Sequence, residues 1–220
     1  MNNKRKIFNL ILLDESGSMH SIKQATIEGF NETAQTIKAI QQQHPEEDHY
    51  ITLVTFNGMG IKTLLSNQPV MELAEIEAKH YSPNANTPLY DAMGVTFQRL
   101  RYQLDLIKNY RVLVSIFTDG VENASKEFTG EAIKRLVEEL KSEQWTFTYI
   151  GANHDVQKFA SQISIHNTIT FKSNAESVQH SLLQERNARM RYYQNVRENK
   201  QVGENYFTVT PPHKDSQPKD

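Results

Sequence analysis

The sequence predicts an α/β fold in which a doubly wound, mostly parallel sheet of about six strands carries helices on both faces. Three short apolar runs, rich in β-branched and aromatic residues, have the length of buried strands: residues 7–13, 50–56 and 111–117. Continuous apolar runs of this kind suit strands that are covered on both faces. Longer segments with helical spacing separate the runs, and this alternation predicts βαβ units.

Two amphipathic helices are expected between these strands, at residues 20–43 and 88–108. Each segment places its apolar residues on one stripe, as a helix that packs on a sheet requires. In the first helix the stripe is formed by Ile22, Thr26, Phe30, Ala34, Ile37 and Ile40, and in the second by Ala92, Val95, Leu100, Leu104 and Ile107.

The remaining elements continue the same alternation. A short strand at 60–65 follows Phe56 so closely that only a hairpin fits, so it is expected as an antiparallel edge strand. Further along the chain the pattern predicts a helix near 130–141, a strand at 145–150, a short helix near 156–162 and a strand at 168–171.

A last helix and a tail are expected at the C-terminal end. Ser173 and Glu176 have the spacing of a capping box, which predicts a helix at about 174–199. Beyond it, prolines among charged and polar residues do not supply a core, so 203–220 is expected to be a disordered tail. The sequence therefore predicts one domain, 1–202, followed by this tail.

Composition limits the classes of function. The chain has 24 Lys and Arg against 26 Asp and Glu, a formal charge of −2, which argues against a nucleic-acid coat or a polybasic membrane anchor. Cysteine is absent, which excludes disulfides, thiolate metal sites and cysteine nucleophiles. No apolar run reaches 18 residues, and the apolar start 7–13 is interrupted by Asn9 and followed by acidic residues, unlike a signal peptide. The expected location is the cytoplasm.

The last helix carries the strongest basic pattern in the chain, because four arginines interleave with two tyrosines. This pattern could contact nucleic acid, but Glu185 and Glu198 dilute it and the whole chain is acidic. A solvated helix that packs on the sheet is favoured. The basic and aromatic residues in question are Arg186, Arg189, Arg191, Arg197, Tyr192 and Tyr193.

The segment with the clearest chemistry follows the first predicted strand. Asp14, Ser16 and Ser18 alternate there, and Gly17 is expected to let the backbone turn tightly so that their oxygens converge. Ligands of open α/β sheets bind at the carboxyl ends of the strands, which is where this turn lies. Converging hard oxygens suit Mg²⁺, Mn²⁺ or Ca²⁺.

Two further loops can deliver side chains to the same place. Asp119 follows the strand at 111–117, and Thr87 immediately precedes the helix that begins with Pro88. Alone, Ser16 or Thr87 could be an ordinary helix cap. The combination of three such loops favours a shared site.

These motifs, Asp-x-Ser-Gly-Ser, Thr-Pro-Leu-x-Asp-Ala and Thr-Asp-Gly, resemble those of the von Willebrand factor A domain family, whose fold is Rossmann-like, and its metal-ion-dependent adhesion site. The resemblance covers roughly residues 7–171. It implies that Ser16, Ser18 and Thr87 are hydroxyl ligands of a metal ion, with Asp14 and Asp119 near the ion largely through water. Small stand-alone members that resemble this chain occur in bacteria and phages.

The expected function is divalent-cation-dependent protein binding, in an adaptor or assembly module. Neutral hydroxyl and water ligands leave a cation electrophilic, so that it can accept another oxygen anion. In the family this anion is typically a Glu or Asp of a protein partner. Mg²⁺ is the expected ion, with Mn²⁺ or Ca²⁺ as alternatives, and the partner itself is unknown.

Two other functions stay open. A phosphotransfer enzyme of the haloacid-dehalogenase type would keep a nucleophilic Asp at the end of the first strand, but Ser16 stands where its second carboxylate is needed as general acid. No nucleotide-binding glycine motif and no serine-hydrolase motif is present. No catalytic role is therefore expected. The third function is a structural subunit whose metal site is vestigial.

Several polar residues near these loops have two interpretations. His20 could border the site or be a solvated residue at a helix start, and the second is favoured. Asp91 could support the site or be an ordinary first-turn charge. Capping of the following helix is favoured for Asn153 or Asp155, and an ordinary turn is slightly favoured over a role in partner choice for Glu122 and Asn123.

Overall fold

A computed structural model describes residues 4–152 and 155–208 and confirms the α/β fold with a six-stranded sheet. The strands are β1 (Arg5–Asp14), β2 (Glu47–Asn57), β3 (Gly60–Pro69), β4 (Tyr110–Thr118), β5 (Trp145–Ala152) and β6 (Asn167–Phe171). The helices are α1 (Lys23–Gln43), α2 (Leu89–Leu104), α3 (Gly130–Ser142), α4 (Val156–Gln162) and α5 (Ala175–Arg197). Short 3₁₀ turns are η1 (Gly17–Ile22), η2 (Val70–Glu72) and η3 (Ala78–His80).

The order of strands in the sheet is β3-β2-β1-β4-β5-β6. Only the β2–β3 hairpin is antiparallel, as expected from the short connection between these strands. The central strand β1 pairs in parallel with both β2 and β4, so that Leu10 is opposite Thr52 on one side and Val114 on the other. The chain adds strands on one side of β1 first and then on the other, which places the topological switch between β1 and β4.

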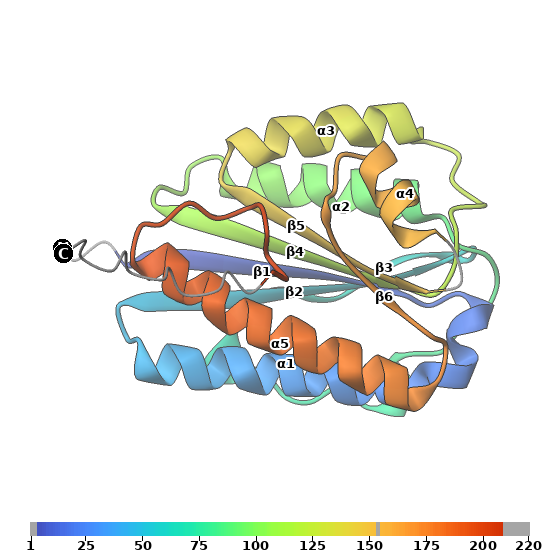
Figure 1. Cartoon of the computed structure of the whole chain (residues 1–220), viewed down its shortest axis with the longest axis horizontal. Helices are drawn as coiled ribbons and strands as arrows, with labels where there is room; N and C mark the ends of the chain where they lie inside the picture. The colour runs from blue at the N-terminus through green and yellow to red at the C-terminus, as the bar shows by residue number, and fades with distance from the viewer. Residues whose placement is uncertain (1–3, 153–154, 209–220) are drawn as a thin grey trace, which may run out of the picture.

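Helices cover both faces of the sheet (Figure 1). Helices α1 and α5 lie on one face, and α2, α3 and α4 lie on the other. Alternate residues of β1 enter the two cores: Ile11 and Leu13 pack toward α1 and α5, whereas Leu10 and Leu12 pack toward the opposite helices. Because both faces are apolar, the strand reads as a continuous apolar run in the sequence.

Helices α1 and α5 approach each other closely at one glycine. A Cβ atom built on Gly29 would lie 2.0 Å from Cδ1 of Leu182, far inside van der Waals contact. The absence of a side chain at position 29 therefore makes room for a leucine of the neighbouring helix.

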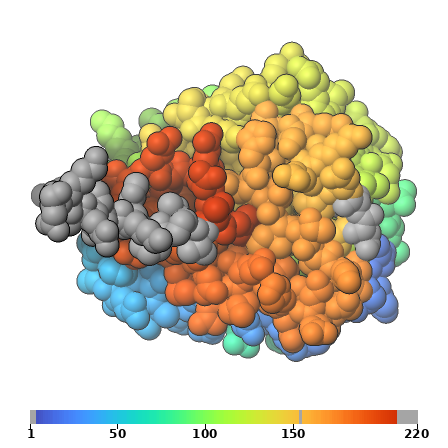
Figure 2. Space-filling view, in the orientation of Figure 1, coloured from blue at the N-terminus to red at the C-terminus, as the bar shows by residue number. Residues whose placement is uncertain are grey.

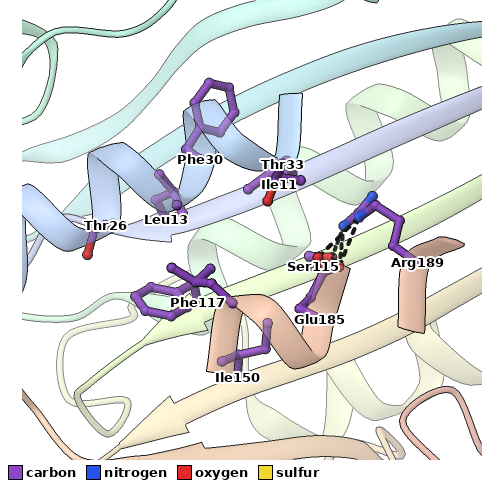
Figure 3. A pocket seen from close by; sticks show the side chains of 12 residues that line it. Ile11, Leu13, Thr26, Phe30, Thr33, Ser115, Phe117, Ile150, Glu185 and Arg189 are labelled. Carbon is purple, nitrogen blue, oxygen red and sulfur yellow. Dashed lines mark hydrogen bonds and ion pairs between the residues drawn. The ribbon is translucent and has the colours of Figure 1, made fainter. Parts of the chain in front are cut away.

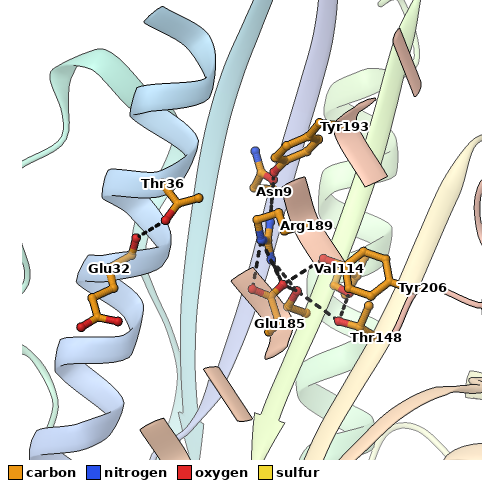
Figure 4. Close-up of polar contacts among 10 residues, drawn as sticks. Asn9, Glu32, Thr36, Val114, Thr148, Glu185, Arg189, Tyr193 and Tyr206 are labelled. Carbon is orange, nitrogen blue, oxygen red and sulfur yellow. Dashed lines mark hydrogen bonds and ion pairs between the residues drawn. The ribbon is translucent and has the colours of Figure 1, made fainter. Parts of the chain in front are cut away.

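A polar cluster is buried between α5 and the sheet (Figure 4). The Arg189 guanidinium pairs with the Glu185 carboxylate, with 2.5 Å between Nη2 and Oε1, and both side chains are almost fully buried. Arg189 also donates to Ser115 Oγ at 2.8 Å and to Asn9 Oδ1 at 2.9 Å. The pattern of arginines on this helix therefore does not describe a uniformly solvated basic surface, because Arg189 belongs to the interior.

A cavity of about 30 Å³ lies beside this cluster, between α1, α5 and the strands β1, β4 and β5 (Figure 3). Apolar side chains such as Phe30 and Phe117 line most of it, and Glu185 and Arg189 close one end. This volume is enough for a buried water.

Two helix starts differ from the sequence predictions. The first helix was expected to begin at His20, but residues 17–22 form the η1 turn and α1 begins at Lys23. The N-cap of α5 is Asn174, whose side chain accepts a hydrogen bond from Ser177 N, and not Ser173. Asn and Ser are equally good N-caps, so composition alone does not distinguish these neighbouring positions.

The segment after α5 packs on the domain beyond residue 203, where the sequence predicts that a tail begins. Tyr206 is buried, with its hydroxyl donating to Glu185 Oε1 at 3.1 Å and its backbone N–H donating to Asn167 Oδ1 at 3.0 Å. Figure 2 shows this segment, in red, between α5 and the layer of helices on the other side of the sheet. Residues 203–208 therefore pack with the domain, and the rest of the expected tail lies outside the described residues.

Across the described ranges 4–152 and 155–208, no helix combines the length and the apolar character that crossing a membrane requires.

Candidate functional site

The carboxyl end of β1 places Asp14 at the switch point of the sheet, where its side chain is buried. Its Oδ1 atom accepts a hydrogen bond from the Ser16 backbone N–H at 2.7 Å, and its Oδ2 atom accepts one from Thr118 Oγ1 at 2.6 Å. Burial raises the pKa of the Asp14 carboxyl to about 6, although these hydrogen bonds favour the ionised form and Asp119 nearby disfavours it. Desolvation thus makes the ionised form of this carboxyl less favourable than it would be in water.

A chain of hydroxyl groups connects the turn after β1 with the end of β4. Ser16 Oγ and Ser18 Oγ are 3.1 Å apart, and Ser18 Oγ donates to Asp119 Oδ1 at 2.5 Å. Ser173, which precedes α5, contributes a further hydroxyl at 3.5 Å from Asp119 Oδ2. Ser173 is not among the predicted site residues, because its spacing from Glu176 indicates a helix cap.

Thr87 reaches the same place from the loop that precedes α2, and the evidence comes from Gly120. A Cβ atom built on Gly120 would lie 3.0 Å from Thr87 Oγ1, 3.7 Å from Asp14 Oδ2 and 3.7 Å from Ser18 Oγ. One point in space is therefore in contact range of oxygens from the turn after β1 and from the loop before α2, and Asp119, beside Gly120 on the loop after β4, accepts from Ser18 at the same place. The glycine keeps this point free of side-chain atoms.

All five residues predicted as metal ligands are thus gathered at one edge of the sheet: Asp14, Ser16, Ser18, Thr87 and Asp119. The set contains three neutral hydroxyls and two carboxylates. Hard divalent cations prefer such oxygen donors, so the residues fit Mg²⁺, Mn²⁺ or Ca²⁺. Within the part of the chain that the structure describes, no three His, Cys, Asp or Glu side chains form a metal-ligating cluster, so a site of the His-and-carboxylate type is not assembled there.

Gly17 does not have the role that the sequence analysis gave it. The positive-φ glycines of the described residues are Gly60 and Gly203, so Gly17 does not adopt a conformation that favours glycine. A Cβ atom at Gly17 would meet only the Ala85 backbone, at ordinary contact distances of 3.6 and 3.8 Å. The turn is closed instead by hydrogen bonds, including Gly17 N to Ala85 O at 2.9 Å.

Glu15 and Tyr81 join the turn after β1 to the loop that carries Thr87. The buried Glu15 carboxylate accepts from Ser82 N at 2.6 Å and pairs with Lys62 at 3.4 Å. The Tyr81 hydroxyl, also buried, donates to the backbone oxygen of Asp14. Sequence spacing gives no signal for these contacts, because they connect residues 47 or 67 positions apart.

Asp91, Glu122 and Asn123 do more than cap a helix or form a turn. The Asp91 carboxylate accepts three backbone N–H groups, those of residues 126, 127 and 128, at 2.7 to 2.9 Å. Glu122 accepts from Tyr90 N at 2.8 Å, in the first turn of α2. Asn123 Oδ1 accepts from Thr87 N at 2.9 Å. These contacts fasten the loop after β4 to the start of α2.

The other candidates have simpler roles. Asp155 caps α4 by accepting from Lys158 N at 3.0 Å, as the sequence favoured, whereas Asn153 lies outside the described residues. His20 is exposed in the η1 turn.

Comparisons with known proteins identify the family and the fold. The family model of the von Willebrand factor type A domain matches residues 10–185. No curated protein matches the chain. Among solved structures, a von Willebrand factor type A protein from Catenulispora acidiphila superposes with a TM-score of 0.58 at 13% identity, covering 84% of this chain and 43% of that one. The chain thus spans less than half the length of that structure.

Two other structures share the fold at low identity. The VWA domain of SpRpn10 has a TM-score of 0.55 and 15% identity, covering 81% of this chain and 94% of that domain. The manganese-loaded TRAP protein of Plasmodium vivax has a TM-score of 0.50 and 15% identity, covering 83% of this chain and 72% of that protein. Because the family model covers most of the sequence and these structures share its fold, the chain belongs to the von Willebrand factor type A domain family, whose domains generally bind other proteins.

Proposed function

We propose that this domain binds a protein partner through a divalent cation held at the carboxyl edge of its sheet. Asp14, Ser16, Ser18, Thr87 and Asp119 would hold the ion. The proposal is supported chiefly by the convergence of oxygens from three loops around the space beside Gly120. A cation held there would supply a Lewis-acidic position for one carboxylate oxygen of a partner.

The donor set favours binding over turnover. The three hydroxyl donors add no charge to the site, and Asp14 and Asp119 would act largely through water, so a divalent cation would stay electrophilic enough to attract a further anion. Ser16 occupies the position at which a phosphotransfer enzyme of the haloacid-dehalogenase type would need a general acid. A serine hydroxyl does not donate a proton efficiently near neutral pH, so this arrangement disfavours phosphotransfer.

Metal-dependent thermal unfolding tests the first half of the proposal. The purified chain is unfolded after chelation and again with Mg²⁺, Mn²⁺ or Ca²⁺ added back. An ion at 100 times its dissociation constant should stabilise the fold by about 2.7 kcal/mol, several degrees in a domain of this size. Asp14→Ala should abolish the shift. Asp105→Ala, which removes an exposed carboxylate beyond the end of α2, should retain it.

A carboxylate probe tests the second half. Acetate titrated into the Mn²⁺-loaded protein should displace metal-bound water, which lowers the water-proton relaxation rate. No change in relaxation at saturating Mn²⁺ would contradict an open coordination position. Turnover of a generic aryl phosphate with Mg²⁺, abolished by Asp14→Ala, would instead support the phosphotransfer alternative.

A further inference from the structure

The backbone of Thr87 is hydrogen-bonded at both its N–H and its oxygen to a single residue of another loop. Its backbone N–H donates to Asn123 Oδ1 at 2.9 Å, and its backbone oxygen accepts from Asn123 N at 3.1 Å. One residue of the loop after β4 therefore holds both polar groups of the Thr87 peptide backbone. Thr87 itself is buried, with 3% of its surface exposed.

The loop that carries Asn123 is itself fixed on both sides. Glu122, the preceding residue, accepts from Ala124 N at 2.8 Å, from Ser125 N at 2.7 Å and from Tyr90 N in α2. On the far side, Ser125 Oγ accepts from Asp91 N at 3.0 Å, and the Asp91 carboxylate binds the next three backbone N–H groups. Asn123 thus projects from a rigid segment, which makes it suitable for positioning another group.

This segment also begins at the site. Asp119 and Gly120 lie four and three positions before Asn123, and the Cβ position of Gly120 is 3.0 Å from Thr87 Oγ1. The two loops meet at the metal position and are joined again by the Asn123 side chain. The Asn123 side chain is therefore placed to set the position of Thr87 relative to the other donors.

We propose that Asn123 is a positioning residue that holds the Thr87 hydroxyl in the metal-ligand geometry. This inference rests on the proposed function, because it assumes that the site binds a divalent cation. Asn123 acts through Thr87 and is not a ligand in this proposal. Residues that orient metal ligands from behind typically change metal affinity by about 10- to 100-fold when they are replaced.

The side chain of Asn123 is exposed, so its removal can be separated from a loss of folding. Asn123→Ala deletes the Oδ1 acceptor and leaves the backbone hydrogen bond from its own N–H to Thr87 O. Asn86→Ala is a matched control, since Asn86 is an exposed asparagine directly before Thr87. Mn²⁺ affinity is measured by electron paramagnetic resonance for the full chain and both variants, with unfolding of the chelated proteins recorded in parallel.

Asn123→Ala should weaken Mn²⁺ binding by about tenfold. The unfolding midpoint of the metal-free variant should stay within about a degree of the parent's. Asn86→Ala should bind Mn²⁺ like the parent. Unchanged Mn²⁺ affinity in Asn123→Ala would overturn the inference and leave the proposed function intact. A weaker affinity accompanied by an equally destabilised metal-free protein would also overturn it, because the residue would then be structural. If the parent chain itself binds no Mn²⁺, the proposed function fails, and this inference fails with it.

A double-mutant cycle identifies the route of the effect. In a Thr87→Ala background, which keeps the other four donors, Asn123→Ala should weaken Mn²⁺ binding by less than about twofold, since coupled residues are not additive. An equal loss in both backgrounds would show that Asn123 acts on a different ligand.

Discussion

Thr118 Oγ1 donates a hydrogen bond of 2.6 Å to Asp14 Oδ2, and this contact joins the ends of β1 and β4 at the switch point of the sheet. The same hydroxyl oxygen accepts a hydrogen bond from the Gly120 backbone N–H at 3.1 Å. The last residue of β4 thus aligns both the carboxylate of β1 and the glycine that leaves space beside it. A side-chain hydrogen bond thus connects the two strands at the place where the site forms.

The buried carboxylate of Asp14 should make the metal-free protein less stable as the pH rises. Its pKa in the folded state, about 6, exceeds the ordinary value of 3.8, so the folded chain binds this proton more tightly than the unfolded chain. The stability from this group is present below pH 3.8 and is lost as the pH rises through about 6. In chelator at pH 7.5, the free energy of unfolding of Asp14→Asn should therefore exceed that of the parent by up to about 3 kcal/mol, as measured by urea unfolding.

The same titration should act on metal binding in the opposite direction. A cation competes with the proton, so Mn²⁺ affinity should weaken by up to tenfold per pH unit below about 6. Equal affinity at pH 5 and pH 7 would contradict a role for the ionised Asp14 carboxylate.

Gly120→Ala should remove metal binding while the fold persists. The added methyl group would lie 3.0 Å from Thr87 Oγ1 and 3.7 Å from two further donors, in the space assigned to the ion. Gly17→Ala adds the same group to the facing loop, where the nearest atom is 3.6 Å away and space is adequate. Isothermal titration with Mg²⁺ should show binding for Gly17→Ala and none for Gly120→Ala, and equal binding by both would refute the assigned position.

Tyr81→Phe should loosen the turn after β1. The lost hydrogen bond to the Asp14 backbone oxygen lies in a buried place, so the free energy of unfolding should fall by about 1–3 kcal/mol. Tyr102→Phe, at a tyrosine that is 83% exposed, should change it by less than about 0.5 kcal/mol. Urea unfolding in chelator compares the two variants, and equal stabilities would show that the Tyr81 hydroxyl contributes nothing.

Arg189→Met should destabilise the domain by about 3–5 kcal/mol, because it leaves the Glu185 carboxylate buried without its charged partner. Arg186→Met, at an exposed position of the same helix, serves as control. The double variant Glu185→Met with Arg189→Met should recover at least half of the lost stability in the same urea experiment. A double variant that is less stable than Arg189→Met would contradict this expectation and show that Glu185 stabilises the fold through other contacts, such as the hydrogen bond from Tyr206.

The sequence predicts the fold well where one local pattern dominates. Buried parallel strands need apolar residues on both faces, so β1, β2 and β4 were recognisable from a single run each. The residues predicted as ligands lie at one edge of the sheet, because parallel strands end there, and metal binding by them stays a prediction. Element ends were less accurate: the 3₁₀ turn at 17–22 has nearly the same apolar spacing as the helix that follows it.

Other features depend on contacts between distant parts of the chain and have no local signature. Tyr206 stands in a polar segment, and its burial depends on partners elsewhere in the chain: Asn167 and Glu185 accept its hydrogen bonds, and its ring packs against Tyr192. Arg189 reads as a surface residue until its carboxylate partner one helical turn away is seen to be buried with it. Composition describes a segment as a whole, whereas burial is decided residue by residue.

The close approach of α1 and α5 limits how this sequence can diverge. A side chain at position 29 would collide with Leu182, so the two positions share one small volume. Descendants of this chain can enlarge residue 29 by reducing residue 182, by turning its side chain away, or by moving the helices apart. Substitutions at positions 29 and 182 are therefore expected to be coupled during evolution, although 153 positions of sequence separate them.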